Sequence, residues 1–253
     1  MPKAMIENEI LAFAIAVMAL CMGGVLKGAT GAGAPVIVVP ILALLYDVPL
    51  AVALFTFPNL IANTWQGWSF RSARLPLRFV LAFAGGGAIG AAFGTVMLAR
   101  LPADTLMGGV AVVVFVYIAF RLARPGWRLA EARATRIALP VDIFGGVLQG
   151  AGGISAPVSV TFLNAMGLTR DQFIATIAIF FVGLSLVQIP TLSWFGILTP
   201  ERVLWSIAAT LPIFAAMPLG AALARRLSRE TFDKIVLALL AIIALRMLAG
   251  ALL

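Results

Sequence analysis

The sequence predicts an all-α polytopic membrane protein built from two inverted repeats, and three observations lead to this prediction. Hydrophobic residues make up 62% of the 253 residues, and charged residues only 11%. A water-soluble domain of this length needs far more polar surface. Apolar runs follow one another along nearly the whole chain, and one glycine-proline segment occurs twice within them, 122 residues apart.

The repeated segment reads GGVLKGATGAGAPVIVVPIL at 23–42 and GGVLQGAGGISAPVSVTFLN at 145–164, with eleven of the twenty aligned positions identical. A duplicated break inside apolar sequence is typical of a transporter made of two related halves. We therefore expect a single transmembrane domain over the whole chain, divided into two repeats and a linker. Their expected bounds are about 8–122 for repeat 1, about 123–136 for a basic cytoplasmic linker and about 137–253 for repeat 2.

Six apolar segments reach the roughly 20 residues that a membrane-spanning helix needs. They are residues 48–70, 77–98, 103–122, 171–195, 203–224 and 232–253. The arms 137–149 and 156–167 beside the second loop are shorter and reach only ~20 Å, against a hydrocarbon core of ~30 Å. Each repeated loop is therefore expected to be the tip of a broken or re-entrant helical hairpin. The arm at 10–26 is longer, so a fully spanning first hairpin stays open.

One hairpin and three crossings per half would invert the second half relative to the first. The arginine-rich loops at 71–78 and 121–136 are cytoplasmic by the positive-inside rule. The inverted arrangement then places thirteen basic residues inside and four on or near the outside. Equivalent loops of the two halves thus carry opposite charge biases, as an inverted topology requires. The basic linker is expected to be a solvated connector at the membrane surface, with binding of lipid head groups as the alternative. Binding of nucleic acid is not expected.

Composition also excludes several kinds of chemistry. The chain has no histidine and one cysteine, Cys21. Haem and zinc sites and a disulfide are therefore not expected, and we predict no metal and no cofactor. No Gly-x-Ser-x-Gly motif and no acidic pair lie inside a span, so we predict that the protein is not an enzyme.

The repeated loops are the candidate binding site. Glycines there permit backbone conformations closed to other residues, and the prolines that follow suit the first turn of a helix. We expect N–H groups near Gly31, Gly33, Gly153 and Ser155 to be unpaired, with Ser155 supplying a capping oxygen. Two such helix starts meeting near the bilayer midplane would form an electropositive pocket suited to an anion.

Polar side chains inside the apolar runs are the other candidates. Lys27 would lie deep in the membrane, where a charge needs a partner or a function, and Gln149 takes its place in the second half. The amides that could donate to an anion are Asn59, Asn63, Gln66 and Gln188. The alternatives are that Lys27 reaches the far interface and that the amides join helices as structural contacts.

No acidic residue is expected in the interior of a span, and Asp142 is the deepest candidate. A sodium or proton site built on a buried carboxylate is therefore disfavoured, although a coupled proton stays open. Small-residue stripes predict close helix packing. They are Gly24/Gly28, Gly146/Gly150, Gly86/Gly90/Gly94 and Ala216/Gly220/Ala224. A homodimer is a further expectation from these glycine faces.

The segment from Gly28 to Pro35, followed by Val39-Pro40 and recurring in the second half, resembles the TauE/SafE family of sulfite-exporter-like permeases, also called the toluene-sulfonate uptake permease group. The resemblance covers essentially the whole chain. It implies movement of sulfite, sulfonates, sulfoacetate or related sulfur anions across bacterial inner membranes. The chain departs from the family pattern where three adjacent glycines are frequent, and its second copy has Thr161-Phe162 in place of Val-Pro.

The expected function is a secondary transporter for a small anion, with a sulfur-containing oxyanion or organosulfonate as its substrate and alternating access as its mechanism. The alternative is an anion-selective channel that uses the same electropositive constriction. Substrate identity, direction of transport and coupling ion cannot be read from the sequence.

Overall fold

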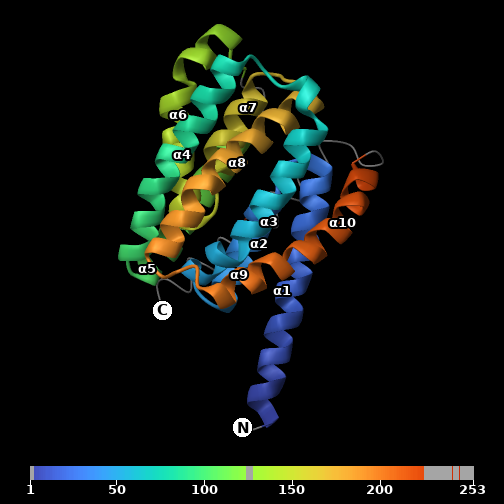
Figure 1. Cartoon of the computed structure of the whole chain (residues 1–253), viewed down its shortest axis with the longest axis vertical. Helices are drawn as coiled ribbons and strands as arrows, with labels where there is room; N and C mark the ends of the chain where they lie inside the picture. The colour runs from blue at the N-terminus through green and yellow to red at the C-terminus, as the bar shows by residue number, and fades with distance from the viewer. Residues whose placement is uncertain (1–2, 124–127, 225–240, 242–244, 246–253) are drawn as a thin grey trace.

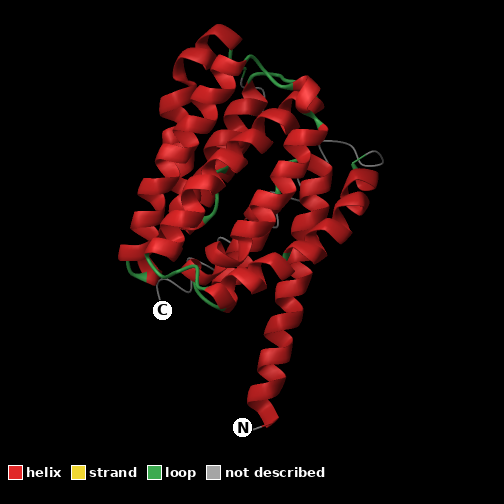
Figure 2. Cartoon of the chain, viewed as in Figure 1, coloured by secondary structure: helices red, strands yellow, loops and turns green. Residues whose placement is uncertain are grey.

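The computed structural model describes residues 3–123, 128–224, 241 and 245, and apart from short connections these are helical, with no strand among them (Figure 2). The helices are α1 (Lys3–Thr30), α2 (Ala34–Leu45), α3 (Val48–Ser69), η1 (Arg71–Ala73), α4 (Leu77–Arg100), α5 (Ala103–Ala123), α6 (Glu131–Gly152), the π-helix η2 (Ala156–Val160), α7 (Thr161–Ala165), α8 (Arg170–Trp194), α9 (Pro200–Ala208) and α10 (Thr210–Leu223). The predicted all-α class is confirmed.

Five helical stretches among the described residues are long and apolar enough to cross a membrane. They are Glu9–Thr30, Val48–Ser69, Leu77–Arg100, Arg170–Trp194 and Pro200–Leu223. Four of them coincide with predicted spans, and α5 covers a fifth predicted span with a shorter apolar stretch. The predicted span at 232–253 lies outside the described residues, apart from residues 241 and 245. The orientation of the two repeats across a membrane stays a prediction.

Both repeated segments form helical hairpins with the same break. Gly31 and Gly153 adopt left-handed φ angles of 86° and 70°. Each donates its N–H to the carbonyl four residues earlier, on Lys27 and Gln149 respectively, at 2.7 Å. This is the left-handed helix termination that glycine permits without steric cost. In Figure 1, α1 rises toward its break from the N-terminus at the bottom of the view, whereas α6 descends toward its break from the top.

The entering arms are longer than predicted. α1 has 28 residues and α6 has 22, which correspond to ~42 and ~33 Å, so the prediction of a short arm at 137–149 is wrong. Charged residues at 131–136 were read as linker, but alanine, glutamate and arginine are strong helix formers and extend the helix outward. The return arms are short: α2 has 12 residues, or ~18 Å, and η2 with α7 covers Ala156–Ala165.

Each entering arm packs on a helix of the other half. α1 lies along α10, and α6 lies along α4. A Cβ added at Gly28 would overlap the carbonyl oxygen of Met217, and one at Gly90 would overlap that of Ile143. The close packing predicted from the glycine stripes is confirmed at both crossings. The stripe on α4 is used within the chain, so it no longer argues for a homodimer.

The loop tips also lie against the opposite half. Space beside Gly31 is filled by Ile174 of α8, and space beside Gly153 by Val39 of α2. Ala32 joins the apolar cluster around Phe83 and Phe180, whereas Ile154 and Ala156 join the cluster that contains α2. The two breaks are therefore held inside the bundle by side chains of the other repeat, and this positions the polar residues beside them.

Candidate functional site

Lys27 is buried beside the first break. It lies in the last turn of α1 and is only 2% exposed. Its ammonium donates to Oδ1 of Asn63 at 2.9 Å and to the carbonyl oxygen of Gly31 at 3.3 Å. Both acceptors belong to uncharged groups, and an ammonium has three N–H donors. The structure thus places a lysine amino group inside the bundle with uncharged groups as its described partners.

Asn63 is held in the orientation that faces Lys27. Its Nδ2 donates to both the backbone and the side-chain oxygen of Asn59, at 2.7 and 2.8 Å. The side chain of Asn59 in turn donates to Oγ of Ser185 on α8 at 3.3 Å. We call Lys27, Gly31, Asn59, Asn63 and Ser185 the first-loop network. It joins α1, α3 and α8 through buried polar atoms.

Sequence reasoning placed Asn59 and Asn63 among the candidate amides but left out Ser185. A signal for Ser185 was present, because it stands at the position equivalent to Asn63 under the repeat offset of 122. Polar residues at equivalent positions of two related helices indicate a shared interface. The sequence alone did not show that these two helices, α3 and α8, lie side by side.

The second loop is bridged by Gln149. This side chain is 2% exposed, and its Oε1 accepts the backbone N–H of Ser155 at 2.9 Å across the break. The hydroxyl of Ser155 is fully buried and has no hydrogen-bond partner among the described residues. We call Gln149 and Ser155 the second-loop pair. Among the described residues, no hydrogen bond joins this pair to the first-loop network.

The prediction of unpaired N–H groups at the loops is wrong for all four residues. Besides the two glycines that bond back to Lys27 and Gln149, Gly33 donates its N–H to Oγ1 of Thr30 at 3.1 Å. Ser155 gives its N–H to Gln149 and makes no side-chain cap of its own. Backbone carbonyls thus satisfy two of these N–H groups, and neighbouring side chains satisfy the other two. These four N–H groups are therefore not free to bind an anion.

Gln66 and Gln188 belong to neither group. Both are 3% exposed, on α3 and α8, and each keeps one buried amide atom without a partner in the described part of the chain: Oε1 of Gln66 and Nε2 of Gln188. Buried polar atoms are nearly always paired, so an orphaned one marks a place where a ligand or water is accommodated. These two residues therefore remain candidate ligand contacts.

Asp142 overturns the expectation that the spans contain no acidic residue. It is the twelfth residue of α6, is fully buried, and accepts a hydrogen bond from Oγ of Ser159 at 2.6 Å. The helix begins six residues earlier than predicted, so Asp142 is its twelfth residue instead of the sixth, and contact with Ser159 of the returning arm is made inside the protein. The argument against a buried carboxylate therefore fails.

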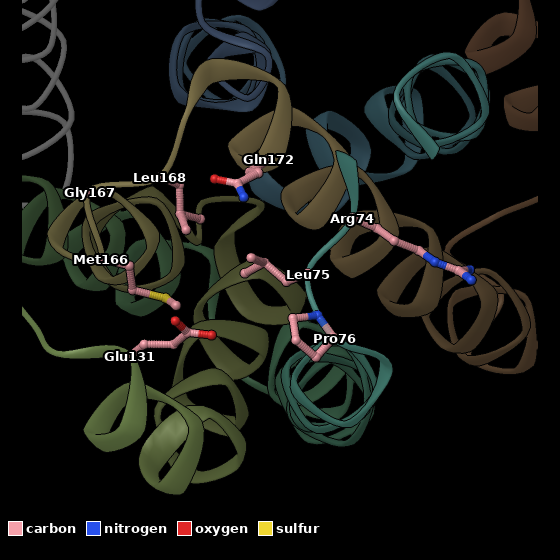
Figure 3. Close-up of a pocket in the computed structure, with 8 residues that line it drawn as sticks. All are labelled: Arg74, Leu75, Pro76, Glu131, Met166, Gly167, Leu168 and Gln172. Atoms are coloured by element: carbon pink, nitrogen blue, oxygen red, sulfur yellow. The ribbon is translucent and has the colours of Figure 1, made fainter. Parts of the chain in front are cut away.

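A surface pocket of about 340 Å³ lies away from these groups (Figure 3). It is formed where the link from α3 to α4, the start of α6 and the link from α7 to α8 meet. Arg74 points away from the other lining side chains, and Gln172 also caps the start of α8. None of the predicted site residues lines it, so the buried loop region is the better candidate.

Residues 15–247 match the model of a protein family described as Sulfite exporter TauE/SafE. The match covers both hairpins and nearly the whole chain, and it confirms the resemblance seen in the repeated loops. Comparison with curated proteins and with solved structures found no match.

Proposed function

The chain belongs to the sulfite exporter TauE/SafE family of membrane transporters, and on that premise we propose that it moves a small anion by alternating access. The substrate class is a sulfur-containing oxyanion or organosulfonate, such as sulfite or sulfoacetate. The membrane is a bacterial inner membrane. Each hairpin moves together with the helix that it packs against, and the two resulting units move relative to each other.

The burial of Lys27 carries this proposal. An ammonium removed from water costs many kcal/mol unless an opposite charge approaches it. Its described partners, Asn63 and Gly31, are uncharged. An anion that reaches Lys27 would supply the missing charge, so the same residue both attracts anions and disfavours cations. A sodium-type site would need an excess of negative groups there instead.

The second loop and α8 add donors for a substrate with several oxygens. The hydroxyl of Ser155 and Nε2 of Gln188 are buried and without partners among the described residues. A sulfite or sulfonate group carries three oxygens, so one cation and two neutral donors can each take one. In this proposal the two loops close on the anion from opposite sides, as expected for a site shared by two repeats.

Exchange transport tests the function directly. Purified protein in liposomes loaded with unlabelled sulfite, sulfoacetate or taurine is diluted into a trace of the labelled compound. Saturable counterflow with a sulfur anion is the expected result, because the binding site of a transporter carries one substrate molecule across the membrane and returns with another bound. Single-channel currents or flux that never saturates would favour the channel alternative. Absence of saturable flux with every sulfur anion would contradict the proposed substrate class.

A charge placed on the second loop tests whether that loop belongs to the site. Gln149→Glu keeps the oxygen that accepts the N–H of Ser155 and adds a negative charge. The added charge would lie beside Ser155, which the proposal assigns to the anion, and two like charges within ~10 Å at an effective dielectric of about 20 repel by at least ~1.7 kcal/mol, or more than tenfold in affinity. The apparent KM for counterflow should rise by that factor.

The matched control is Gln172→Glu, which makes the same chemical change at the start of α8, where Gln172 completes a capping box that glutamate also completes. This control should leave the KM unchanged. Equal KM values for the two variants would place the anion away from the second loop.

A further inference from the structure

Asp142 and Ser159 form a buried polar pair that the anion site does not use. Asp142 lies on α6 and Ser159 on the returning π-helix, and both are fully buried. Their hydrogen bond of 2.6 Å uses one carboxyl oxygen. The other, Oδ2, is buried without a partner in the described part of the chain. Half of this carboxyl group is therefore available to another species.

The described charges around Asp142 do not neutralise it. The elements packed against α6 are α4, α5 and η2. Of these, α4 carries only Arg78 and Arg100, both at its ends, and η2 carries no charged residue. The titratable residues of α5 are Asp104, Tyr117 and Arg121. On α6 itself the nearest charged residue is Arg136, six positions earlier, or ~9 Å along the helix.

The first hairpin has the same break and return as the second but lacks a buried polar pair like Asp142 and Ser159. The positions equivalent to Asp142 and Ser159 are Leu20 and Ile37, and both are buried. The same hairpin thus packs with two apolar residues at this depth. Replacing a buried polar pair by apolar residues of similar size is frequently neutral or stabilising. A carboxyl group that is present in only one hairpin, and is costly there, points to chemistry rather than to packing.

We propose that Asp142 is a proton-binding site that couples anion movement to a proton, with Ser159 holding the carboxyl group in place. The proposal rests on the transport function proposed above. A proton added to the carboxylate gives the neutral acid, and its loss restores the charge. No other reactant is required, and a small cation such as sodium is disfavoured because only one carboxylate and one hydroxyl meet there.

The spacing along α6 supplies the coupling. Asp142 lies seven residues before Gln149 at the loop tip, or ~10 Å. An anion at the tip and a charged Asp142 repel each other by an amount worth on the order of tenfold in affinity. The anion therefore binds about tenfold more tightly when Asp142 carries a proton, and by linkage the bound anion favours proton uptake equally. Anion and proton consequently move together in the same direction.

The experiment separates exchange from coupled accumulation. Liposomes containing wild-type protein or Asp142→Asn are assayed with labelled sulfoacetate, first for counterflow at equal pH on both sides, then for accumulation driven by an imposed pH gradient. We expect the wild type to do both. Asp142→Asn should retain counterflow and should lose accumulation. Accumulation at the wild-type level in this variant would overturn the proposal.

A second variant covers the case in which asparagine disrupts the fold. Asp142→Leu combined with Ser159→Ile reproduces the apolar pair of the first hairpin and should be stably folded in detergent. It should also exchange without accumulating. A folded double variant that has lost counterflow as well would mean that Asp142 is needed for anion binding itself, which overturns the coupling role.

Failure of the transport proposal is recognised separately, because the wild type would then show no counterflow. Infrared difference spectroscopy of the purified protein still tests the proton site in that case. A carboxylic-acid carbonyl band that titrates in the wild type and is missing from Asp142→Asn is expected. The same band in both proteins, or in neither, would overturn the assignment.

Discussion

Lys27→Gln is expected to reduce anion counterflow by 100-fold or more in kcat/KM while leaving the protein folded. Glutamine can still donate to Oδ1 of Asn63, and Gln149 shows that a buried glutamine fits at the equivalent place of the second hairpin. The variant therefore removes the charge with little change in packing. Losing one partner of a buried charge pair costs ~3–5 kcal/mol, which corresponds to at least 100-fold.

Two comparisons make this measurement specific to the charge. Lys27→Arg keeps the charge and should retain part of the flux, with a changed preference among anions because the planar guanidinium presents a different donor geometry. Lys27→Met removes both the charge and the donor, leaving Asn63 Oδ1 and the Gly31 carbonyl without it. It should therefore also lower the melting temperature. Flux at the wild-type level in Lys27→Gln would show that the ammonium of Lys27 is not part of the anion site.

The sequence located the two hairpins because their signal is local. Unusual backbone conformations were expected for the glycines of both loops, and two of these glycines, Gly31 and Gly153, have left-handed φ angles. Contacts at the glycine stripes were likewise predictable, since small residues four apart on an apolar helix indicate close packing. The identity of the helices that meet at these stripes was not predictable, because it depends on how the two halves pack together. Gly28 packs on α10 and Gly90 on α6.

The state of the loop N–H groups could have been anticipated. Thr30 precedes Gly33 by three residues, and a threonine hydroxyl at that spacing accepts from backbone N–H groups. Gln149 is long enough to reach across its own break to Ser155. Glycine content alone predicted open donors, whereas the side chains beside the glycines determine whether those donors stay open.

Asp142 was missed through an error in one helix boundary. The segment EARATR is polar enough to read as a cytoplasmic linker and also favourable enough to continue a helix. With the helix starting at Glu131, Asp142 becomes its twelfth residue instead of the sixth and meets Ser159 of the returning arm. Hydropathy assigns polar residues to ends, so it fails where a helix carries a polar extension and a buried charge together.

Gly90→Ala is expected to destabilise the protein by about 3 kcal/mol, because the contact beside Gly90 is backbone on backbone. The added Cβ would overlap the carbonyl oxygen of Ile143 and come within 2.8 Å of the backbone nitrogen of Val147. Neither atom can rotate away as a side chain could, so α4 and α6 have to separate. Overpacking of this kind typically costs ~1–3 kcal/mol, and separating two long helices places the effect at the upper end. Thermal unfolding in detergent, followed by tryptophan fluorescence, measures it.

Gly85→Ala is the matched control on the same helix, where an added Cβ meets nothing within 4 Å. Alanine is the better helix former by ~1 kcal/mol, so this variant should be at least as stable as the wild type. Gly28→Ala, at the equivalent crossing of α1 and α10, should destabilise the protein as Gly90→Ala does, because its Cβ would overlap the carbonyl oxygen of Met217. Equal melting temperatures for Gly85→Ala and Gly90→Ala would mean that α4 and α6 are not in close contact. The hairpin of the second half would then not be held by α4 of the first half. The two could not move as one unit, which the proposed alternating access requires.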